Sequence, residues 1–352
     1  MEIRIEYIIS FAMAFIISFL ATPLAKKIAL GLGAVDIPND DRRMHKKPMA
    51  RLGGLAIIVG FFTVIIYFAL TGGDIYEHLN SNQFMAYIMG AVIIIALGII
   101  DDIKPLSSKL KFMVQIIAAY IVILPVDNRI GFITNPFGET PQPISFEALI
   151  IGISILWIVG ITNAVNLIDG LDGLAAGVSA IAAISMFSVA VITNQPAIAV
   201  IIITLAGSTL GFLPYNFNPA KIFMGDTGSM FLGFTLAVLS IQGLMKTYAV
   251  LAIALPLLIL GLPIFDTAFA IIRRVVNGKP IGEADRGHLH HRLIDMGLSH
   301  RQSVSVLYII SGSLGLVSIT LTDKGLLPAV IFVILVSVFI VGGTRIMNQM
   351  DD

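Results

Sequence analysis

Five aspartates adjoin the ends of long apolar runs, and their types and spacing favour chemistry on a charged substrate. Asp101 and Asp102 follow one run, Asp169 and Asp172 follow another, and Asp226 precedes a third. If a helix continues through Asp169 and Asp172, both carboxylates lie on one face, because residues three apart are neighbours on a helix. Mg²⁺ is usually held by one or two carboxylates together with substrate phosphates and water. The pattern therefore predicts a divalent cation and a diphosphate substrate.

A structural interpretation competes with this one, because a single aspartate at a helix end can simply solubilise that end. Adjacent carboxylates repel unless a cation or a proton lies between them, so five together favour a functional role. Asp266 is different, since it lies inside an apolar run about two turns before Arg273 and Arg274. It is either a buried, paired structural carboxylate or a site residue.

A second group of candidates lies in the segment 284–293, which carries His288, His290, His291, Arg286 and Arg292. Three imidazoles could bind zinc, but helical zinc pairs usually have i, i+4 spacing, and the chain has no cysteine to help them. Phosphate contact or acid–base chemistry by the histidines, with bidentate anion contacts from the arginines, is the interpretation we favour. A solvated basic loop near anionic lipid headgroups is the alternative.

Two more segments contain candidate ligands for an anionic substrate. In 40–54, Lys47 and Arg51 precede a pair of glycines where the chain could turn tightly around an anion. In 214–229, free amides at a helix start favour anions, Asn216 could bind a sugar or a base, and Phe223 could stack on a planar ring. Each of these residues also has an ordinary capping, packing or topological explanation.

The elements that must position these residues are membrane-spanning helices. The chain has 352 residues, of which 57% are hydrophobic and only 12% charged, whereas a soluble chain has about 25% charged residues. The absence of cysteine excludes a disulfide scaffold and iron–sulfur clusters. We expect an all-α, polytopic membrane protein with about eleven crossings, whose apolar runs are 7–24, 52–70, 84–100, 112–126, 148–165, 174–192, 197–213, 228–245, 248–272, 304–321 and 326–342.

Basic residues decide the expected orientation, because short loops rich in Lys and Arg stay in the cytoplasm. If the odd-numbered connections are cytoplasmic, they and the C-terminal tail hold 18 of the 22 basic residues. The N-terminus is then outside and the C-terminus inside, and all five aspartates face the cytoplasm. We expect one multi-pass membrane domain, residues 1–352, whose cytoplasmic site loops are about 25–51, 101–111, 166–173, 214–229 and 273–303.

At this point the motifs resemble those of a known enzyme family, the polyprenyl-phosphate N-acetylhexosamine-1-phosphate transferases. The resemblance rests on four strings in the family's order, which are GIIDD at 98–102, NAVNLIDGLDG at 163–173, FMGDTGS at 223–229 and HLHH at 288–291. PIFD at 263–266 and the His-x-His-His-Arg-Leu form are similar to the branch that uses UDP-N-acetylglucosamine. The sequence KPMARLGG at 47–54 stands where the phospho-muramoyl-pentapeptide branch carries a threonine-rich string.

The resemblance implies transfer of GlcNAc-1-phosphate from UDP-GlcNAc to undecaprenyl phosphate at the inner leaflet of a bacterial or archaeal cell membrane, with release of UMP. This would be the first membrane step of a cell-envelope polysaccharide. It implies Mg²⁺, with Mn²⁺ as a substitute ion, held mainly by Asp226 with Asp102 and Asp169. The catalytic residues would be Asp101, Asp102, Asp169, Asp172, His290 and His291. The substrate-binding residues would be Lys47, Asn163, Asn166, Asn216, Phe223, Arg286, His288 and Arg292.

Three alternatives stay open at this stage. One is the phospho-N-acetylmuramoyl-pentapeptide transferase activity of the related branch. The others belong to different classes, a secondary transporter or lipid flippase and a non-catalytic scaffold, although no internal repeat points to a transporter. No P-loop or Rossmann glycine motif occurs, and the net charge of zero gives no reason to expect nucleic acid as a partner. A homodimer is a further expected state.

Overall fold

The computed structural model describes most of the chain, namely residues 4–37, 48–71, 75–125, 128–130, 147–244, 251–278, 280 and 287–324. Two of the candidate residues, Lys47 and Arg286, lie outside these ranges. The last expected apolar run, 326–342, also lies outside them.

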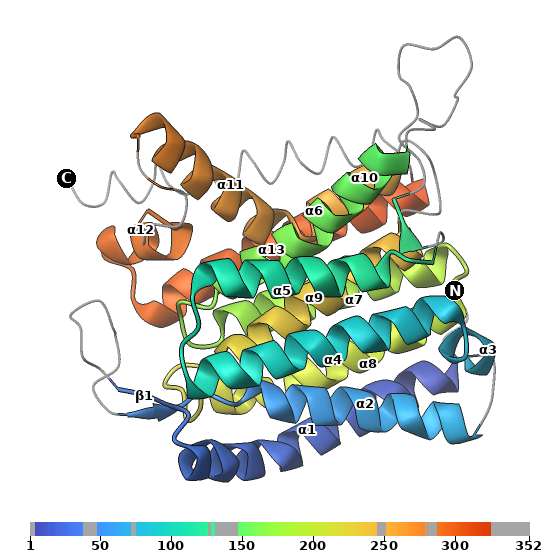
Figure 1. The fold of residues 1–352 in the computed structure, drawn as a ribbon, viewed down its shortest axis with the longest axis horizontal. Helices are drawn as coiled ribbons and strands as arrows, with labels where there is room; N and C mark the ends of the chain where they lie inside the picture. Colours follow the sequence, from blue (N-terminus) through green and yellow to red (C-terminus); the bar gives the residue numbers. More distant parts are fainter. Residues whose placement is uncertain are drawn as a thin grey trace.

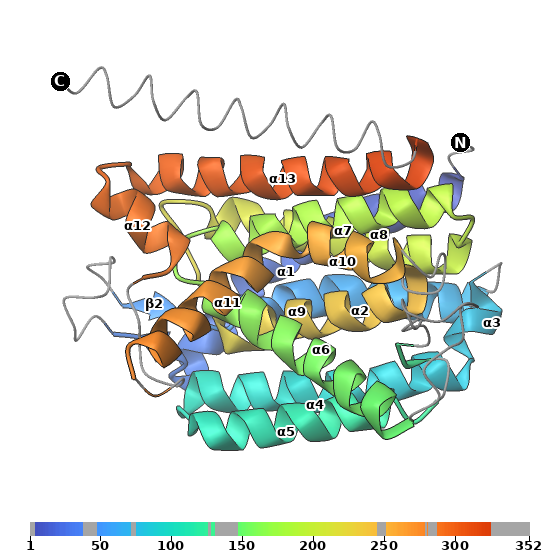
Figure 2. The ribbon, with the colours of Figure 1, turned by 90° about the horizontal axis from the view of Figure 1, so that it is seen from above.

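The described chain is helical almost throughout, as predicted, and its long helices run side by side in one bundle (Figures 1 and 2). Seven of the described helices are long and apolar enough to cross a membrane. They are α1 (Ile5–Leu32), α2 (Gly54–Thr71), α4 (Asn82–Ile103), α6 (Glu147–Leu167), α7 (Leu174–Ile192), α8 (Pro196–Asn216) and α13 (His300–Lys324).

The ninth expected run is broken into α10 (Leu251–Ile259) and α11 (Gly261–Val276), which are bent by 85° and would make an eighth span if counted together. Two further expected runs form shorter or less apolar helices. α5 (Ser108–Val122) has only 15 residues, and α9 (Gly225–Gly243) begins with five small or polar residues. Ten of the eleven expected runs are thus helical, while the number of crossings and the orientation stay predictions.

The remaining described elements are small. α3 (Tyr76–Leu79) and α12 (Leu289–Asp295) are short helices. The only strands in the described ranges are β1 (Val35–Asp36) and β2 (Met49–Ala50), which pair antiparallel. In Figure 1 the strands and α12 lie at one end of the bundle and α3 at the other, so the two ends differ in structure.

α9 is the centre of the bundle, since all of its residues except Asp226 are buried. Its first turn is approached closely by two neighbouring helices. A Cβ atom on Gly98 of α4 would collide with the backbone of Thr227, and one on Gly54 of α2 would collide with the backbone of Gly228. Glycine is therefore needed at both contacts, and the three helices meet where Asp226 lies.

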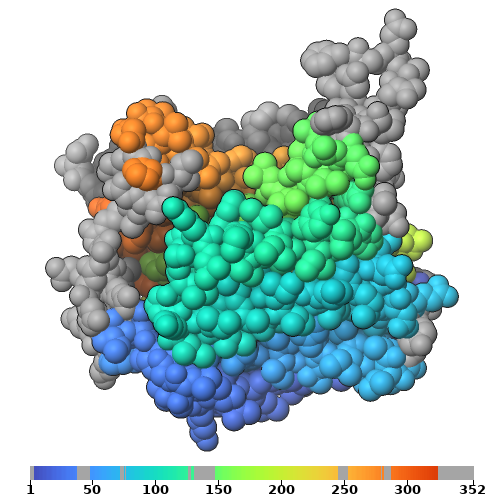
Figure 3. Space-filling view, in the orientation of Figure 1, coloured from blue at the N-terminus to red at the C-terminus, as the bar shows by residue number. Residues whose placement is uncertain are grey.

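The outward faces of α4 and α5 are apolar, as expected for helices that face lipid. α4, α5 and α6 form one side of the molecule in Figure 3. Large hydrophobic side chains of α4 and α5 are exposed, including Val92, Phe112 and Tyr120. Many exposed apolar side chains of this kind are stable in a bilayer and would be a liability in water.

Candidate active site

Asp102, at the C-terminal end of α4, is bound to the first turn of α9. Its Oδ1 atom accepts a hydrogen bond from the backbone N–H of Asp226 at 2.9 Å. Its Oδ2 atom accepts two more from Thr227, one from the backbone N–H at 2.9 Å and one from the hydroxyl at 2.7 Å. The Asp102 side chain is fully buried, with a relative exposure of 0%. It therefore caps α9, satisfying amides that the helix itself leaves without partners.

The turn into α9 needs glycine at Gly225, whose φ is +73°. A Cβ atom there would meet the backbone oxygen of Arg51 and the carboxylate of Asp102. The β1–β2 pair leads into this contact, and the Arg51 side chain lies 3.5 Å from Asp102 Oδ1 and 3.8 Å from Asp36 Oδ1. Arg51 is thus held at the rim of the aspartate cluster.

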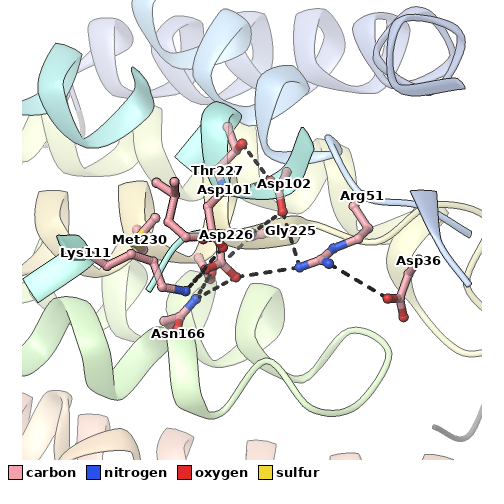
Figure 4. A network of polar contacts seen from close by, with 12 residues as sticks. Asp36, Arg51, Asp101, Asp102, Lys111, Asn166, Gly225, Asp226, Thr227 and Met230 are labelled. Carbon is pink, nitrogen blue, oxygen red and sulfur yellow. Dashed lines mark hydrogen bonds and ion pairs between the residues drawn. The ribbon is translucent and has the colours of Figure 1, made fainter. Parts of the chain in front are cut away.

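Asp226 is the exposed member of this cluster, with 16% of its side chain accessible. The ammonium of Lys111, from α5, lies 2.8 Å from Asp226 Oδ2 (Figure 4). The amide of Asn166, at the end of α6, donates to Asp226 Oδ1 at 3.2 Å and to the Ser229 hydroxyl at 2.8 Å. One guanidinium nitrogen of Arg51 lies 4.0 Å from the same Oδ1 atom. Four helices and a hairpin thereby converge on one accessible carboxylate.

Asp101 shares Lys111 with Asp226, at 3.2 Å from its Oδ2 atom. Its Oδ1 atom accepts a hydrogen bond from the backbone N–H of Leu106 at 2.8 Å, which fixes the turn after α4. The two neighbouring aspartates therefore have different surroundings. Asp102 faces a helix N-terminus, whereas Asp101 faces the cation that it shares with Asp226.

Asp169 and Asp172 lie in the turn between α6 and α7, where the helix is interrupted rather than continuous. Burial first, and then the charges of Asp226 and Asp102, raise the pKa of Asp169 to about 8. Asp169 accepts no hydrogen bond from the residues that the structure describes. Asp172 instead accepts hydrogen bonds from the Asn218 amide at 2.9 Å and the Ala220 backbone N–H at 3.1 Å. Of the pair, Asp169 is the one available to a ligand.

Asn163 and Asn216 are occupied by contacts within the protein. The Asn163 amide donates to Gln115 Oε1 at 2.6 Å, inside the bundle. Asn216 is buried, accepts from the backbone N–H of Gly173 at 3.1 Å and donates to the backbone oxygen of Ile222. These contacts join α8 to the Asp169 turn, so Asn216 supports the site from behind. Phe223 is partly buried, and its backbone N–H donates to the Ala50 oxygen.

The histidine segment packs against the Asp169 turn. His290 is buried, and a Cβ atom on Gly170 would collide with its imidazole, so the two segments are in contact. Burial, assisted by neighbouring His291, lowers the pKa of His290 to about 4, and its imidazole is therefore neutral at pH 7. A neutral His290 can accept a proton but does not supply a positive charge for a phosphate. Arg292 is exposed on α12.

Asp266, whose role the sequence leaves open, has its hydrogen-bond partners in the histidine segment. His288 Nδ1 lies 2.8 Å from Asp266 Oδ2, and the backbone N–H of Leu289 donates to Asp266 Oδ1 at 2.8 Å. Asp266 and His288 are both buried. Asp266 is thus a paired carboxylate that fixes the start of α12 and the orientation of His288, as second-layer carboxylates commonly do for histidine.

The residues present fit a magnesium site in which the protein supplies only part of the coordination and the substrate supplies the rest. In the described part of the chain, no group of three or more His, Asp or Glu side chains is arranged to hold a metal ion. Asp226 is accessible and Asp169 has no hydrogen-bond donor, so the protein offers one or two carboxylate ligands. That number is typical of Mg²⁺ sites completed by phosphates and water.

Three residues of this network did not stand out in the sequence. In the sequence, Lys111 is one of the basic residues of an expected cytoplasmic connection, and Asp36 and Gln115 belong to no motif. Lys111 and Gln115 are the polar residues of a mostly apolar segment, KFMVQIIAAY, that follows the aspartate pair, and this isolation is a signal for both. Asp36 carries no such signal.

The fold and the site together define a class, an α-helical integral membrane protein with a one-sided cluster of carboxylates and cations at the helix ends. Comparison with known proteins agrees with this class. Residues 84–244 match the model of glycosyl transferase family 4, and the relatives described next match nearly the whole chain. The chain belongs to glycosyl transferase family 4.

Its relatives include two branches of the family. A protein of Bacillus subtilis, a probable undecaprenyl-phosphate N-acetylglucosaminyl 1-phosphate transferase, is 43% identical over 95% of this chain and 91% of its own length. A decaprenyl-phosphate N-acetylglucosaminephosphotransferase of Mycobacterium tuberculosis is 36% identical over 85% and 78%. A phospho-N-acetylmuramoyl-pentapeptide-transferase of Staphylococcus haemolyticus is 32% identical over 88% and 97%.

Proposed function

We propose that this protein transfers GlcNAc-1-phosphate from UDP-GlcNAc to undecaprenyl phosphate in a cell membrane, forming undecaprenyl-diphospho-GlcNAc and releasing UMP. One structural observation carries the proposal, namely the accessible Asp226 carboxylate surrounded by Lys111, Arg51 and Asn166 at the ends of membrane-type helices. The greater identity to N-acetylglucosaminyl transferases than to the muramoyl-pentapeptide relative supports this choice of sugar. Family membership favours a transferase over a transporter, flippase or scaffold.

The chemistry must overcome repulsion, because a phosphate monoester attacks a diphosphate and both are anions. A bound Mg²⁺ would neutralise the diphosphate and stabilise the charge that develops on transfer. Asp226 and Asp169 are the residues we assign to that ion, since the Asp226 side chain is partly exposed and Asp169 accepts no hydrogen bond from the described residues. Lys111 and Arg51 lie beside Asp226 and can pair with phosphate oxygens.

The other two carboxylates of the cluster have different proposed roles, one in positioning Asp226 and one toward the lipid phosphate. Asp102 caps α9 and places Asp226, whereas Asp101, beside Lys111, is the carboxylate we assign to orienting or deprotonating the lipid phosphate. We favour direct attack of the acceptor phosphate, since it is already a charged nucleophile. Trapping of a phospho-aspartyl protein in the absence of lipid acceptor would contradict direct attack.

The site is proposed to face the cytoplasm. Most of the basic residues in the sequence lie on the site's side of the expected topology, which supports this orientation. Because the chain has no cysteine, single cysteines can be introduced at Ser107 and Asn194 without background labelling. Membrane-impermeant reagents should label these two positions from opposite sides of the membrane, with Ser107 on the inside.

The direct test of the activity uses the purified full-length protein in detergent with undecaprenyl phosphate. UDP-GlcNAc, UDP-GalNAc and UDP-MurNAc-pentapeptide are supplied separately, with Mg²⁺, with Mn²⁺ or with EDTA, and UMP release is measured. We expect UMP from UDP-GlcNAc only when lipid acceptor and a divalent ion are both present. Turnover confined to UDP-MurNAc-pentapeptide would assign the protein to the other branch, and turnover in EDTA would contradict the magnesium assignment.

A further inference from the structure

Lys111 places a positive charge at the position where a divalent ion would bind. Its ammonium lies between two carboxylate oxygens, 2.8 Å from Asp226 Oδ2 and 3.2 Å from Asp101 Oδ2 (Figure 4). Only 23% of the Lys111 side chain is exposed, so this ammonium is not simply solvated at the surface. Two carboxylates this close repel unless a cation or a proton reduces their charge, and in this structure the Lys111 ammonium is the cation that contacts both.

The other oxygen of Asp226 is also engaged. Asn166 donates to Asp226 Oδ1 at 3.2 Å, and Arg51 lies 4.0 Å away. A magnesium ion would sit about 2.1 Å from a ligand oxygen. At Oδ2 it would then lie within a few ångströms of the Lys111 ammonium, where two positive charges repel strongly. Because of this repulsion, the ion and the ammonium would each weaken the binding of the other at Asp226 Oδ2.

We propose that Lys111 is an exchangeable internal counter-ion, which competes with the divalent ion for Asp226 and, once displaced, becomes available to pair with a substrate phosphate. This inference rests on the proposed function and deepens it, because it links metal binding to phosphate binding through one side chain. It predicts that removing the charge of Lys111 changes the affinity for the metal ion and the affinity for the nucleotide sugar in opposite directions. The metal alone should bind more tightly, while the nucleotide sugar should bind more weakly.

The first test measures metal binding without substrate. Mn²⁺ is titrated into the purified full-length protein, and free Mn²⁺ is followed by electron paramagnetic resonance. K111Q should bind Mn²⁺ about tenfold more tightly than the wild type, because a unit positive charge beside the ion has been removed. K111R keeps the charge and should bind as the wild type does. K109Q is the matched control, since Lys109 is exposed on the same helix, and it should also be unchanged.

A second measurement uses the wild-type protein and does not depend on a variant folding. An amine-reactive reagent is applied with and without Mg²⁺, and lysine modification is quantified by mass spectrometry. The reactivity of Lys111 should rise severalfold when Mg²⁺ is added, while that of Lys109 stays constant. A third readout is KM for UDP-GlcNAc, which should rise in K111Q more than kcat falls.

The outcomes separate this inference from the proposed function. One outcome is that the wild type binds Mn²⁺, that K111Q binds it no more tightly, and that the reactivity of Lys111 does not respond to Mg²⁺. The proposed displacement of Lys111 would then be wrong, while the assignment of a magnesium site would stand. If the wild type neither binds Mn²⁺ nor needs a divalent ion for turnover, the magnesium assignment is wrong. The proposed displacement of Lys111 by that ion is then wrong as well.

Discussion

Thr227 donates two hydrogen bonds to the same oxygen of Asp102, at 2.9 Å from its backbone N–H and 2.7 Å from its hydroxyl. The two residues are 125 positions apart in the chain and both are buried. This contact ties the end of α4 to the start of α9. The neighbouring residues of each, Asp101 and Asp226, are thereby brought to the same Lys111 ammonium.

Loss of the Asp102 cap should lower stability as well as activity. In D102N an amide group replaces one of the two acceptor oxygens and faces N–H donors, which leaves buried polar groups unpaired at a cost of about 1–3 kcal/mol. T227V removes only the hydroxyl and should cost about 1 kcal/mol. Thermal unfolding in detergent measures both variants. A D102N protein as stable as the wild type would show that the cap does not support the fold.

Replacement of Asp226, in contrast to that of Asp102, should remove activity and leave stability unchanged. Its carboxylate is partly exposed and, in our proposal, binds the ion, so D226N should abolish UMP release while the protein stays folded and monodisperse in detergent. D295N is the matched control, because Asp295 is exposed on α12, and it should retain full activity. Turnover of D226N at the wild-type rate would remove Asp226 from the catalytic site.

Titration of Asp169 should lower the free energy of unfolding of the metal-free protein as the pH rises. Its pKa is about 8 in the folded protein against an ordinary value of 3.8. Between these values the folded state holds a proton that the unfolded state has lost, so the free energy of unfolding falls with increasing pH. The slope is at most about 1 kcal/mol per pH unit, because Asp169 is partly exposed.

The measurement compares melting temperatures of the wild type and D169N in EDTA from pH 5 to pH 9. The asparagine variant lacks the titrating group, so its curve should be flatter over this range. Parallel curves for the two proteins would contradict a raised pKa at Asp169. Mg²⁺ should reduce the wild-type slope if it binds the ionised carboxylate.

The histidine segment should be required for activity without holding a metal. Replacing His290 and His291 together with glutamine should lower kcat by about 10²-fold or more if a neutral imidazole transfers a proton. Elemental analysis of the wild type should find no stoichiometric zinc. A zinc content of one per chain that is lost in the double variant would overturn this interpretation.

The sequence was sufficient to predict the helical membrane fold and to single out the aspartates that lie at the helix ends. Apolar runs of about 18 residues identify their own helices: the run 174–192 coincides with α7, and the run 84–100 lies within α4, which is a few residues longer at each end. The aspartates were identifiable because carboxylates beside a bilayer are costly. The condition that a helix continues through Asp169 and Asp172 is not met, since the chain turns there and Asp172 accepts hydrogen bonds from Asn218 and Ala220.

What could not be predicted depends on contacts between distant segments. Asn163 and Asn216 were expected to bind substrate, and the contacts of their amides with Gln115 and the backbone of the Asp169 turn have no signal in the sequence. Asp102 was expected among the metal ligands, which stays a prediction, and its hydrogen bonds to the first turn of α9 were not foreseeable either. A polar residue has the same appearance in a sequence whether it faces a ligand or a neighbouring helix.

The glycine contacts at the start of α9 have a consequence for how this enzyme can vary. Gly54 and Gly98 leave no room for even a methyl group beside residues 227 and 228, so random mutagenesis should find these apolar, chemically inert positions as intolerant as the aspartates. Two glycines that take no part in the chemistry are therefore as necessary to this site as its carboxylates, because only a hydrogen atom fits in place of their side chains.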